Sequence, residues 1–314
     1  MIIPATPSSD AQHAPSSVDR SLRLAVAQSI VPEDPTDPGM LRESGAQIRQ
    51  LMRDASAAGA DLAQFPEGAI TYPGKRVMSS AGPGTLAAAD WSRIDWDVMR
   101  EEAEQVAALA GELGIWTVFG SLHPLTPPRR PHNSLYIVTP QGRLLTRYDK
   151  RYLSNTEISW MYTPGTDPLT FHAGGLAFGC ALCIEVNFPE IFTAYEQLNV
   201  DCMLVSVMVE DAIRPVIAQS YAALHSYWVG YSCAAQHSRT VQAGIVAPGG
   251  RWLARCPANG QPALAIADLD PDSTDKDIVI ALRRARPWRR TARGGLYAQH
   301  VARDDPRSDN RTVF

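Results

Sequence analysis

The chain has 314 residues, of which 45% are hydrophobic and 20% charged, and it carries a formal net charge of −4. This balance predicts a globular protein with one large core or at most two domains, and it argues against a general affinity for nucleic acid or anionic membranes. No apolar run reaches the roughly 18 residues of a membrane span, and five cysteines without a disulfide-framework spacing favour reduced thiols and a cytoplasmic location.

The first half of the chain predicts two strand–helix–strand units. Residues 1–19 lack the basic and long apolar regions of a signal peptide, which indicates a flexible N-terminal tail. Alternating apolar residues in SLRLAVAQ then predict a half-buried strand, and apolar residues at helical spacing from Leu41 to Ala55 predict a helix that ends at Gly59. A short strand (DLAQF), an amphipathic helix closed by Gly114 and a strand (IWTVFGSL) follow.

Further along the chain the sequence also predicts β-hairpins. LYIVT and LLTRYDK flank the turn PQGR, and FHAGGLAFGCALCI contains a Gly-Gly turn. Next come a helix opened by Pro189, a strand (CMLVSVM), a helix from about Pro215 to Tyr227, a strand (YSCAAQ), the hairpin VQAGIVAPGGRWLARC and the strand ALAIADLD. This mixture predicts an α/β (α+β layered) fold, with two packed mixed sheets and helices outside.

Two cysteines stand three positions apart in GCALCIEVNFPE, residues 179–190. If the segment is extended, Cys180 and Cys183 lie about 10 Å apart on opposite faces, too far for a disulfide or a zinc pair. Cys183 falls where the strand is expected to end, at the edge where α/β sheets usually bind ligands. The alternative for a single thiol is a buried structural cysteine, which is the interpretation of the remaining cysteines (Cys180, Cys202, Cys233 and Cys256).

A carboxylate and an ammonium follow two other predicted strands. Glu67 comes directly after a strand in FPEG, and Lys150 ends another in RYDK. Each alone fits a solvated surface charge. Together with Cys183 they make coherent chemistry, because a carboxylate accepts a thiol proton and a fixed ammonium stabilises both a thiolate and an oxyanion.

FPEG, YDK and CIEVNFPE, in that order, resemble the Glu-Lys-Cys signatures of the nitrilase superfamily of carbon-nitrogen hydrolases. The resemblance covers about residues 20–270, from the opening LRLAVAQ to the closing ALAIADLD. It implies one catalytic domain with a four-layer αββα sandwich of two mixed sheets flanked by helices. It also implies a homodimer or higher homo-oligomer, and neither a metal nor an organic cofactor.

The resemblance assigns a role to each motif residue. Glu67 is the expected general base, Lys150 the oxyanion stabiliser and Cys183 the nucleophile. Glu157 matches a second carboxylate that would orient Lys150 or Glu67, and its alternative is a surface acid near TPG. The backbone N–H of Ile184, next to the nucleophile, is expected to join the oxyanion hole. The residues flanking the motifs are candidates for the substrate pocket, although each also fits plain packing or turn chemistry: Tyr72, Trp160 and Asn187.

The expected reaction is hydrolysis of a non-peptide C–N bond of a small amide, through a Cys183 thioester. Nitrilases proper usually have Trp after the cysteine, where this chain has Ile184, which favours an amidase over a nitrilase. A nitrile or an N-carbamoyl amino acid remains a second possible substrate. The sequence also leaves open a Cys-His hydrolase that uses His225 or His237 as its base, and a pseudo-hydrolase that works as a binding module.

The C-terminal arm, residues 271–314, is arginine-rich. LRRARPWRRTARGGLY combines six arginines with Trp288 and Tyr297, a composition that by itself is compatible with nucleic-acid binding. Because the whole chain is acidic, and because such tails occur in the family that the motifs resemble, the preferred interpretation is an arm that packs on a partner subunit.

Overall fold

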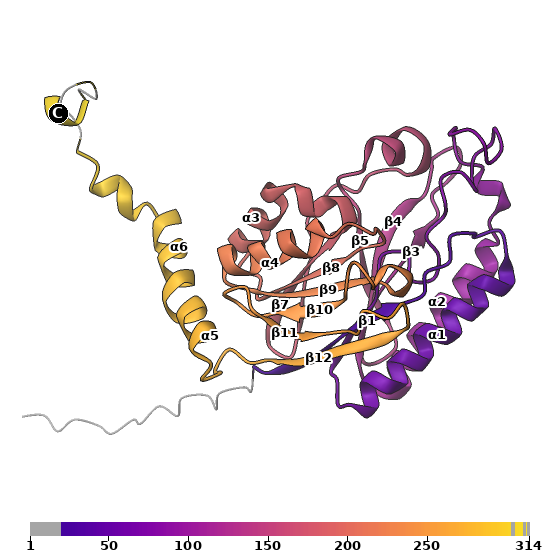
Figure 1. Cartoon of the computed structure of the whole chain (residues 1–314), viewed down its shortest axis with the longest axis horizontal. Helices are drawn as coiled ribbons and strands as arrows, with labels where there is room; N and C mark the ends of the chain where they lie inside the picture. The colour runs from indigo at the N-terminus through magenta and orange to yellow at the C-terminus, as the bar shows by residue number, and fades with distance from the viewer. Residues whose placement is uncertain (1–19, 303–304, 310–311, 313–314) are drawn as a thin grey trace, which may run out of the picture.

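The computed structural model describes residues 20–302, 305–309 and 312, so the predicted tail 1–19 lies outside the described residues (Figure 1). The strands are β1 (Leu22–Ser29), β2 (Leu62–Gln64), β3 (Trp116–His123), β4 (His132–Val138), β5 (Leu144–Asp149), β6 (Thr170–Ala173), β7 (Leu176–Leu182), β8 (Cys202–Ser206), β9 (Trp228–Ala234), β10 (Gly244–Val246), β11 (Trp252–Arg255) and β12 (Ala263–Leu269). The α-helices are α1 (Pro38–Ala57), α2 (Trp96–Leu113), α3 (Pro189–Gln197), α4 (Ile213–His225), α5 (Lys276–Ile280), α6 (Arg286–Arg293) and α7 (Pro306–Asp309).

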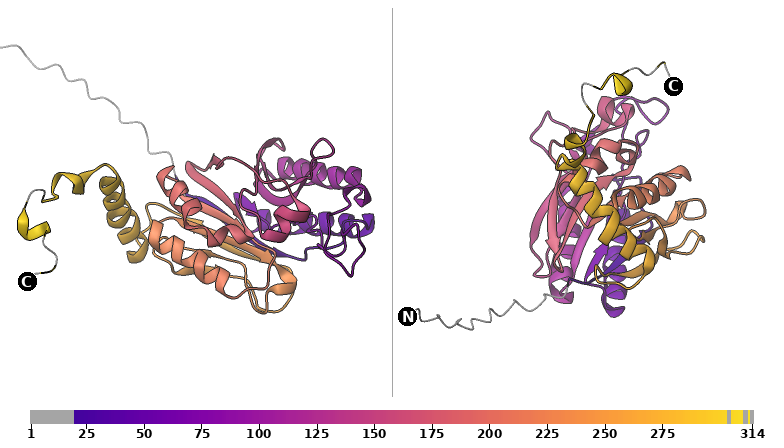
Figure 2. Two further views of the ribbon diagram at one scale, coloured as in Figure 1. Left: turned by 90° about the horizontal axis from the view of Figure 1, so that it is seen from above. Right: turned by 90° about the vertical axis from the view of Figure 1, so that its left-hand side faces the viewer.

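The strands form two mixed halves that curl over one another. One half runs β5-β4-β3-β2-β1 with β12 beside β1, and the other runs β9-β8-β7-β6 with β10 and β11 beside β9. The halves meet at a short parallel pairing of Gln28 with Cys233 and Ser29 with Ala234, so the two expected sheets are joined into one curled sheet of 12 strands. Helices α1 and α2 lie on one side of this body, and α3 and α4 lie on the opposite side (Figures 1 and 2). The layered α+β arrangement predicted from the sequence is confirmed.

From Leu24 onward, strand β1 is buried on both faces, whereas its alternating pattern predicted a half-buried strand. Leu24 and Val26 belong to the core between the two halves of the sheet, and Ala25 and Ala27 belong to the core under α1 and α2. The alternation therefore separates large from small side chains rather than apolar from polar ones, because a helix layer covers the second face.

Capping residues set the helix boundaries. The Asp95 side chain accepts a hydrogen bond from the N–H of Val98 at 3.1 Å and begins α2, and Gly114 ends it in the left-handed conformation with φ 68°. Helix α4 begins and ends two residues earlier than predicted, because Ser226 adopts a left-handed φ of 56° and stops it at His225. The crossovers β1-α1-β2 and β2-α2-β3 both join parallel strands, as predicted.

Gln64 links the two halves of the sheet next to the candidate site. Its side-chain amide donates to the carbonyl oxygens of Val205 at 3.0 Å and Gly230 at 3.1 Å, and to Ser206 Oγ at 3.2 Å. Ser206 Oγ in turn donates to the Phe65 carbonyl at 2.8 Å. These contacts hold the carboxyl end of β2 against the carboxyl end of β8 and the middle of β9.

The arm leaves the body after β12. Arg286 anchors it, with an ion pair from Nη1 to Asp201 at 2.7 Å and a hydrogen bond from Nη2 to the Val200 carbonyl at 2.7 Å. Beyond this anchor the chain runs away from the sheet (Figures 1 and 2). None of the helices formed by the described residues combines the length and apolar character that a membrane crossing requires.

Candidate active site

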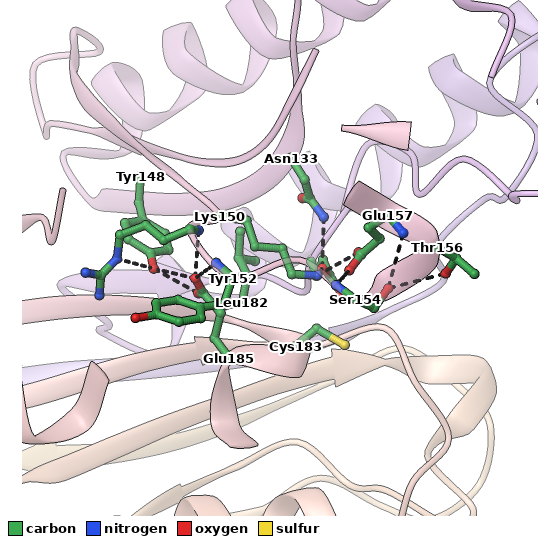
Figure 3. A network of polar contacts seen from close by, with 12 residues as sticks. Asn133, Tyr148, Lys150, Tyr152, Ser154, Thr156, Glu157, Leu182, Cys183 and Glu185 are labelled. Atoms are coloured by element: carbon green, nitrogen blue, oxygen red, sulfur yellow. Dashed lines mark hydrogen bonds and ion pairs between the residues drawn. The ribbon is translucent and has the colours of Figure 1, made fainter. Parts of the chain in front are cut away.

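Three strand ends bring the predicted catalytic residues together. Glu67 follows β2, Lys150 follows β5 and Cys183 follows β7. The first two strands belong to one half of the curled sheet and β7 to the other. Figure 3 shows Cys183 beside the polar network that surrounds Lys150 and Glu157.

Lys150 is held between two carboxylates. Its Nζ lies 2.8 Å from Glu67 Oε1 and 2.8 Å from Glu157 Oε1, and all three side chains are buried. Asn133 Nδ2 also donates to Glu67 Oε1, at 2.9 Å, and the Ser154 N–H donates to Glu157 Oε2 at 2.7 Å. The ammonium is therefore fixed in position.

Burial and mutual charge shift the pKa values of Lys150, Glu67 and Glu157 in different directions. Burial opposes the ammonium form of Lys150, but Glu67 and Glu157 outweigh it and hold the pKa of Lys150 well above its usual value. Burial raises the pKa of Glu67, and Lys150 offsets this only in part. The pKa of Glu157 is lowered, because the ion pair with Lys150 and the bonds from Ser154 outweigh its burial.

Cys183 stands at a sharp turn rather than in a strand. Strand β7 ends at Leu182, and residues Cys183–Asn187 form a 3-10 helix (η3). Cys183 has a φ of 47°, a left-handed value that non-glycine residues rarely adopt. The extended segment considered for Cys180 and Cys183 therefore ends one residue before Cys183, because β7 stops at Leu182.

The thiol of Cys183 is neutral at rest. The side chain is 4% exposed, and burial together with Glu67 and Glu157 raises the pKa of the thiol to about 12, although Lys150 and Arg214 oppose this. A thiolate in this place would be a third negative charge facing Lys150. The sulfur therefore needs a base that removes its proton as it reacts.

Glu67 has one oxygen available for that task. Its Oε2 atom is buried and has no hydrogen-bond partner among the described residues, whereas Oε1 accepts from Lys150 and Asn133. A buried carboxylate oxygen without a donor is costly unless a ligand or a reacting group supplies the proton. The arrangement suits proton transfer from a thiol and on to a leaving group.

Sequence reasoning assigned no role to Glu185, which connects the lysine and cysteine segments. Its buried carboxylate accepts from the backbone N–H groups of Leu182 at 2.7 Å, Arg151 at 2.8 Å and Tyr152 at 3.1 Å, and from the hydroxyl of Tyr148 (Figure 3). The sequence signal for Glu185 was a carboxylate two residues after Cys183 in an apolar run. Asn133 was also missed, and nothing local in its sequence pointed to Glu67.

The predicted pocket residues differ in where they lie. Tyr72 remains a candidate pocket residue: burial raises the pKa of its hydroxyl well above the usual value, and the nearby Glu67, Glu157 and Cys183 raise it further. Trp160 is 38% exposed and Asn187 is exposed, and no hydrogen bond joins either side chain to Glu67, Lys150 or Cys183 within the described part of the chain.

The remaining sequence predictions concern Ile184 and the two histidines. Ile184 lies directly after Cys183 in the first turn of η3, so its N–H remains the predicted second oxyanion donor. His225 stacks between the rings of Tyr221 and Tyr227 and is not among the groups acting on Cys183, and burial lowers its pKa to about 4. His237 lies 3.6 Å from Glu210.

No group of three or more metal-ligating side chains occurs among residues 20–302, 305–309 and 312. The chemistry that the site itself offers is nucleophilic attack by a thiol with a carboxylate base and a fixed ammonium. Such a set suits acyl transfer at a carbonyl or nitrile carbon.

The sequence model of the carbon-nitrogen hydrolase family matches residues 23–278. Solved structures of similar fold include an amidase from Nesterenkonia sp., 20% identical, with a TM-score of 0.65 over 86% of this chain and 96% of the amidase chain. A Cys-to-Ala variant of the Nesterenkonia sp. AN1 amidase in complex with butyramide gives the same identity, TM-score and coverage. A Glu-to-Gln variant with the acetamide moiety of fluoroacetamide added at the active-site cysteine is 19% identical, with a TM-score of 0.65 over 88% and 98% of the chains.

Proposed function

The chain belongs to the carbon-nitrogen hydrolase family and is an enzyme of the amidase/nitrilase type, and we propose that it hydrolyses a small amide to a carboxylic acid and ammonia through a thioester on Cys183. The observation that carries this proposal is the placement of Lys150, 2.8 Å from each of two buried carboxylates and beside a buried thiol. A purely structural ion pair would need only one of those carboxylates.

In the proposed first half-reaction, Cys183 Sγ attacks the amide carbon while Glu67 takes the thiol proton. The carbonyl oxygen becomes an oxyanion, held by the Lys150 ammonium and the Ile184 N–H. Glu67 then passes the proton to the amide nitrogen, the C–N bond breaks, and ammonia leaves a thioester.

In the second half-reaction, water attacks the thioester carbon and Glu67 takes its proton. The C–S bond breaks, the acid is released, and Glu67 returns the proton to Sγ. Glu157 keeps Lys150 charged and in place during both halves, because it supplies a second buried negative charge at 2.8 Å.

A nitrile would form a thioimidate with the same residues, and an N-carbamoyl amino acid would present a carbamoyl carbon to the same thiol. We favour a simple amide for two reasons. Ile184 stands where nitrilases proper usually have Trp, and the Nesterenkonia amidase variants bind butyramide or carry an acetamide moiety. The Glu-Lys-Cys set argues against a pseudo-hydrolase, since a binding role requires no base next to a thiol.

We further propose that the protein forms a homodimer or larger homo-oligomer through the arm. Large apolar side chains of the arm and of α4 are exposed: Ile213, Val216, Leu224, Trp288 and Tyr297. A second copy of the chain would cover them. The five cysteines are all free, which supports a reducing compartment such as the cytoplasm.

The test is ammonia release from a panel of aliphatic and aromatic amides, nitriles and N-carbamoyl amino acids. Wild type, Cys183→Ala and Cys180→Ala are compared, because Cys180 is a buried thiol three positions away that the mechanism does not use. The proposal expects release by wild type and Cys180→Ala, highest with small amides, and none by Cys183→Ala. Release that survives in Cys183→Ala would exclude the mechanism, and silence of the wild type across the panel would favour the binding-module hypothesis.

A further inference from the structure

Arg214 reaches the nucleophile from a different element than Lys150 does. It stands in the first turn of α4, and its side chain is buried. Its Nη1 donates to the carbonyl oxygen of Cys183 at 3.1 Å, and its Nε donates to Asp211 Oδ2 at 3.2 Å. Asp211 also accepts from the Ile213 N–H, at 3.2 Å, so the guanidinium is fixed to the start of the helix.

The backbone at Cys183 requires such an anchor. A non-glycine residue at a φ of 47° is disfavoured relative to the right-handed region, and it persists only where surrounding contacts outweigh that cost. Cys183 has left the β7 ladder, and the only side chain that caps the 3-10 helix within the described residues, Glu185, bonds the N–H of Leu182 and not the carbonyl of Cys183. The bond from Arg214 therefore supplies a charged donor to a carbonyl at the strained position itself.

We infer that Arg214 is a positioning residue for the nucleophile. Its side chain holds the Cys183 turn in its left-handed conformation and adds a second positive charge near the sulfur. This inference rests on Cys183 being the nucleophile of the proposed function, but it does not depend on which substrate is hydrolysed.

The charged groups around the thiol explain why a second cation matters. Glu67 and Glu157 disfavour a thiolate, while Lys150 and Arg214 favour it. Lys150 also stabilises the Glu67 carboxylate. It therefore favours the ionised form of both the proton donor, Cys183, and the proton acceptor, Glu67, and these two effects oppose each other in the transfer.

Arg214, by contrast, bonds the carbonyl of Cys183 and favours the thiolate, whereas the side chains that bond Glu67 are those of Asn133 and Lys150. When the proton moves from Sγ to Glu67, negative charge moves to the sulfur, where Arg214 stabilises it. The hydroxyls of Tyr72 and Tyr231 also interact electrostatically with Cys183, but they are neutral at physiological pH, because burial raises the pKa of each well above its usual value.

The test is alkylation of the full-length protein by iodoacetamide as a function of pH, followed at the Cys183 peptide by mass spectrometry. The compared proteins are wild type, Arg214→Gln, Arg214→Lys and Arg49→Gln. Arg49 on α1 makes a comparable, largely buried ion pair with Glu102 on α2, at 2.6 Å. Its replacement should lower stability without changing the surroundings of the thiol.

Loss of a charged hydrogen bond predicts about tenfold slower alkylation of Arg214→Gln near neutral pH, with the rise in rate displaced to higher pH. Arg214→Lys keeps the positive charge but loses the planar guanidinium that bonds Asp211 and the Cys183 carbonyl at the same time, so it should react at an intermediate rate. Arg49→Gln should react like wild type. Alkylation of a folded Arg214→Gln at the wild-type rate across the pH range would overturn the inference.

If Arg214→Gln does not fold, Arg214→Lys decides, since an unchanged rate there would also contradict the inference. Because alkylation requires no turnover, a wild type that releases no ammonia leaves this test intact. If Cys180 is labelled at least as fast as Cys183, Cys183 is not the reactive thiol, and the proposed function itself is contradicted.

Discussion

The carboxylate of Glu185 accepts the hydroxyl of Tyr148 with both of its oxygens, at 2.9 and 2.8 Å, although 37 residues separate the two. Tyr148 lies two residues before Lys150, and Glu185 lies two residues after Cys183. Together with the backbone bonds to Arg151 and Leu182, this contact joins the segment that carries Lys150 to the segment that carries Cys183.

Replacement of Glu185 by Gln should therefore damage both stability and catalysis. A glutamine has one accepting oxygen and would turn an amide group toward backbone donors, so we expect the free energy of unfolding to fall by about 2 kcal/mol or more. We also expect kcat to fall more than KM changes. Urea unfolding and steady-state kinetics measure these effects, with Glu190→Gln as an exposed control on α3. Equal behaviour of the two variants would contradict the bridging role.

The pH dependence of kcat/KM should follow the ionisation of Glu67 rather than that of the thiol. Glu67 accepts a proton only when ionised, and burial raises its pKa, so the rate should fall as the pH decreases, with a midpoint above the ordinary 4.5. The pKa of Cys183 is about 12 and that of Lys150 is raised, so no second limb is expected up to about pH 9.

Glu67→Gln tests the same assignment. It should lower kcat by about 10²–10⁴-fold, the range typical of a lost general base. A wild-type profile that rises between about pH 7 and 9, as for an ordinary thiol, would instead indicate a nucleophile that ionises before it reacts.

Glu157→Gln should lower stability in a pH-dependent way. The pKa of Glu157 in the folded protein is lowered, so its stabilising contribution is present above the unfolded-state value and disappears as the pH falls through the folded-state pKa. Breaking a buried pair predicts a loss of about 3 kcal/mol at neutral pH, and the difference from wild type should shrink in acid. Urea unfolding at several pH values measures it, with the exposed Asp167→Asn as control. A difference that grows in acid would contradict the ion pair.

Gly120→Ala should displace the loop that carries Glu67. A Cβ atom at Gly120 would overlap the N atom of Gly68 and the carbonyl oxygen of Pro66, and it would lie 2.9 Å from the carbonyl carbon of Glu67. We expect a destabilisation of about 1–3 kcal/mol and a kcat lowered about 10- to 100-fold. Gly84→Ala is the control, since nothing lies within 4 Å of its Cβ position. Wild-type kcat in Gly120→Ala would show that the loop adapts without moving Glu67.

The proposed oligomer predicts an effect of Trp288→Glu. Trp288 is 70% exposed on the arm, so a charge there should weaken a contact with a second copy and shift the molecular mass toward the monomer. Leu145→Glu, at a 49% exposed apolar residue on β5, is the control. Size-exclusion chromatography with light scattering measures the mass. A wild type that is monomeric at micromolar concentration would contradict the proposal.

Much of the fold was predictable because its signals are local. Gly114 and Pro189 mark helix ends by their own backbone geometry, and the Gly-Gly turn of the β6–β7 hairpin stands in the sequence. The exceptions have equally definite causes. The end of α4 was predicted two residues too late, because the helix is ended by Ser226, a residue without a strong left-handed preference. The burial of the second face of β1 was not predicted, because it results from coverage by α1 and α2, which is a tertiary property.

By itself, the sequence determined which residues stand at the strand ends, since Glu67, Lys150 and Cys183 each follow a strand that local patterns reveal. Only the tertiary structure decided what holds them there. Asn133, Glu185 and Arg214 act on partners 66, 37 and 31 residues away. Contacts over such separations depend on how the two halves of the sheet close over one another. A strand pattern records the face that each side chain occupies, but it carries no information on which residue of another strand lies opposite.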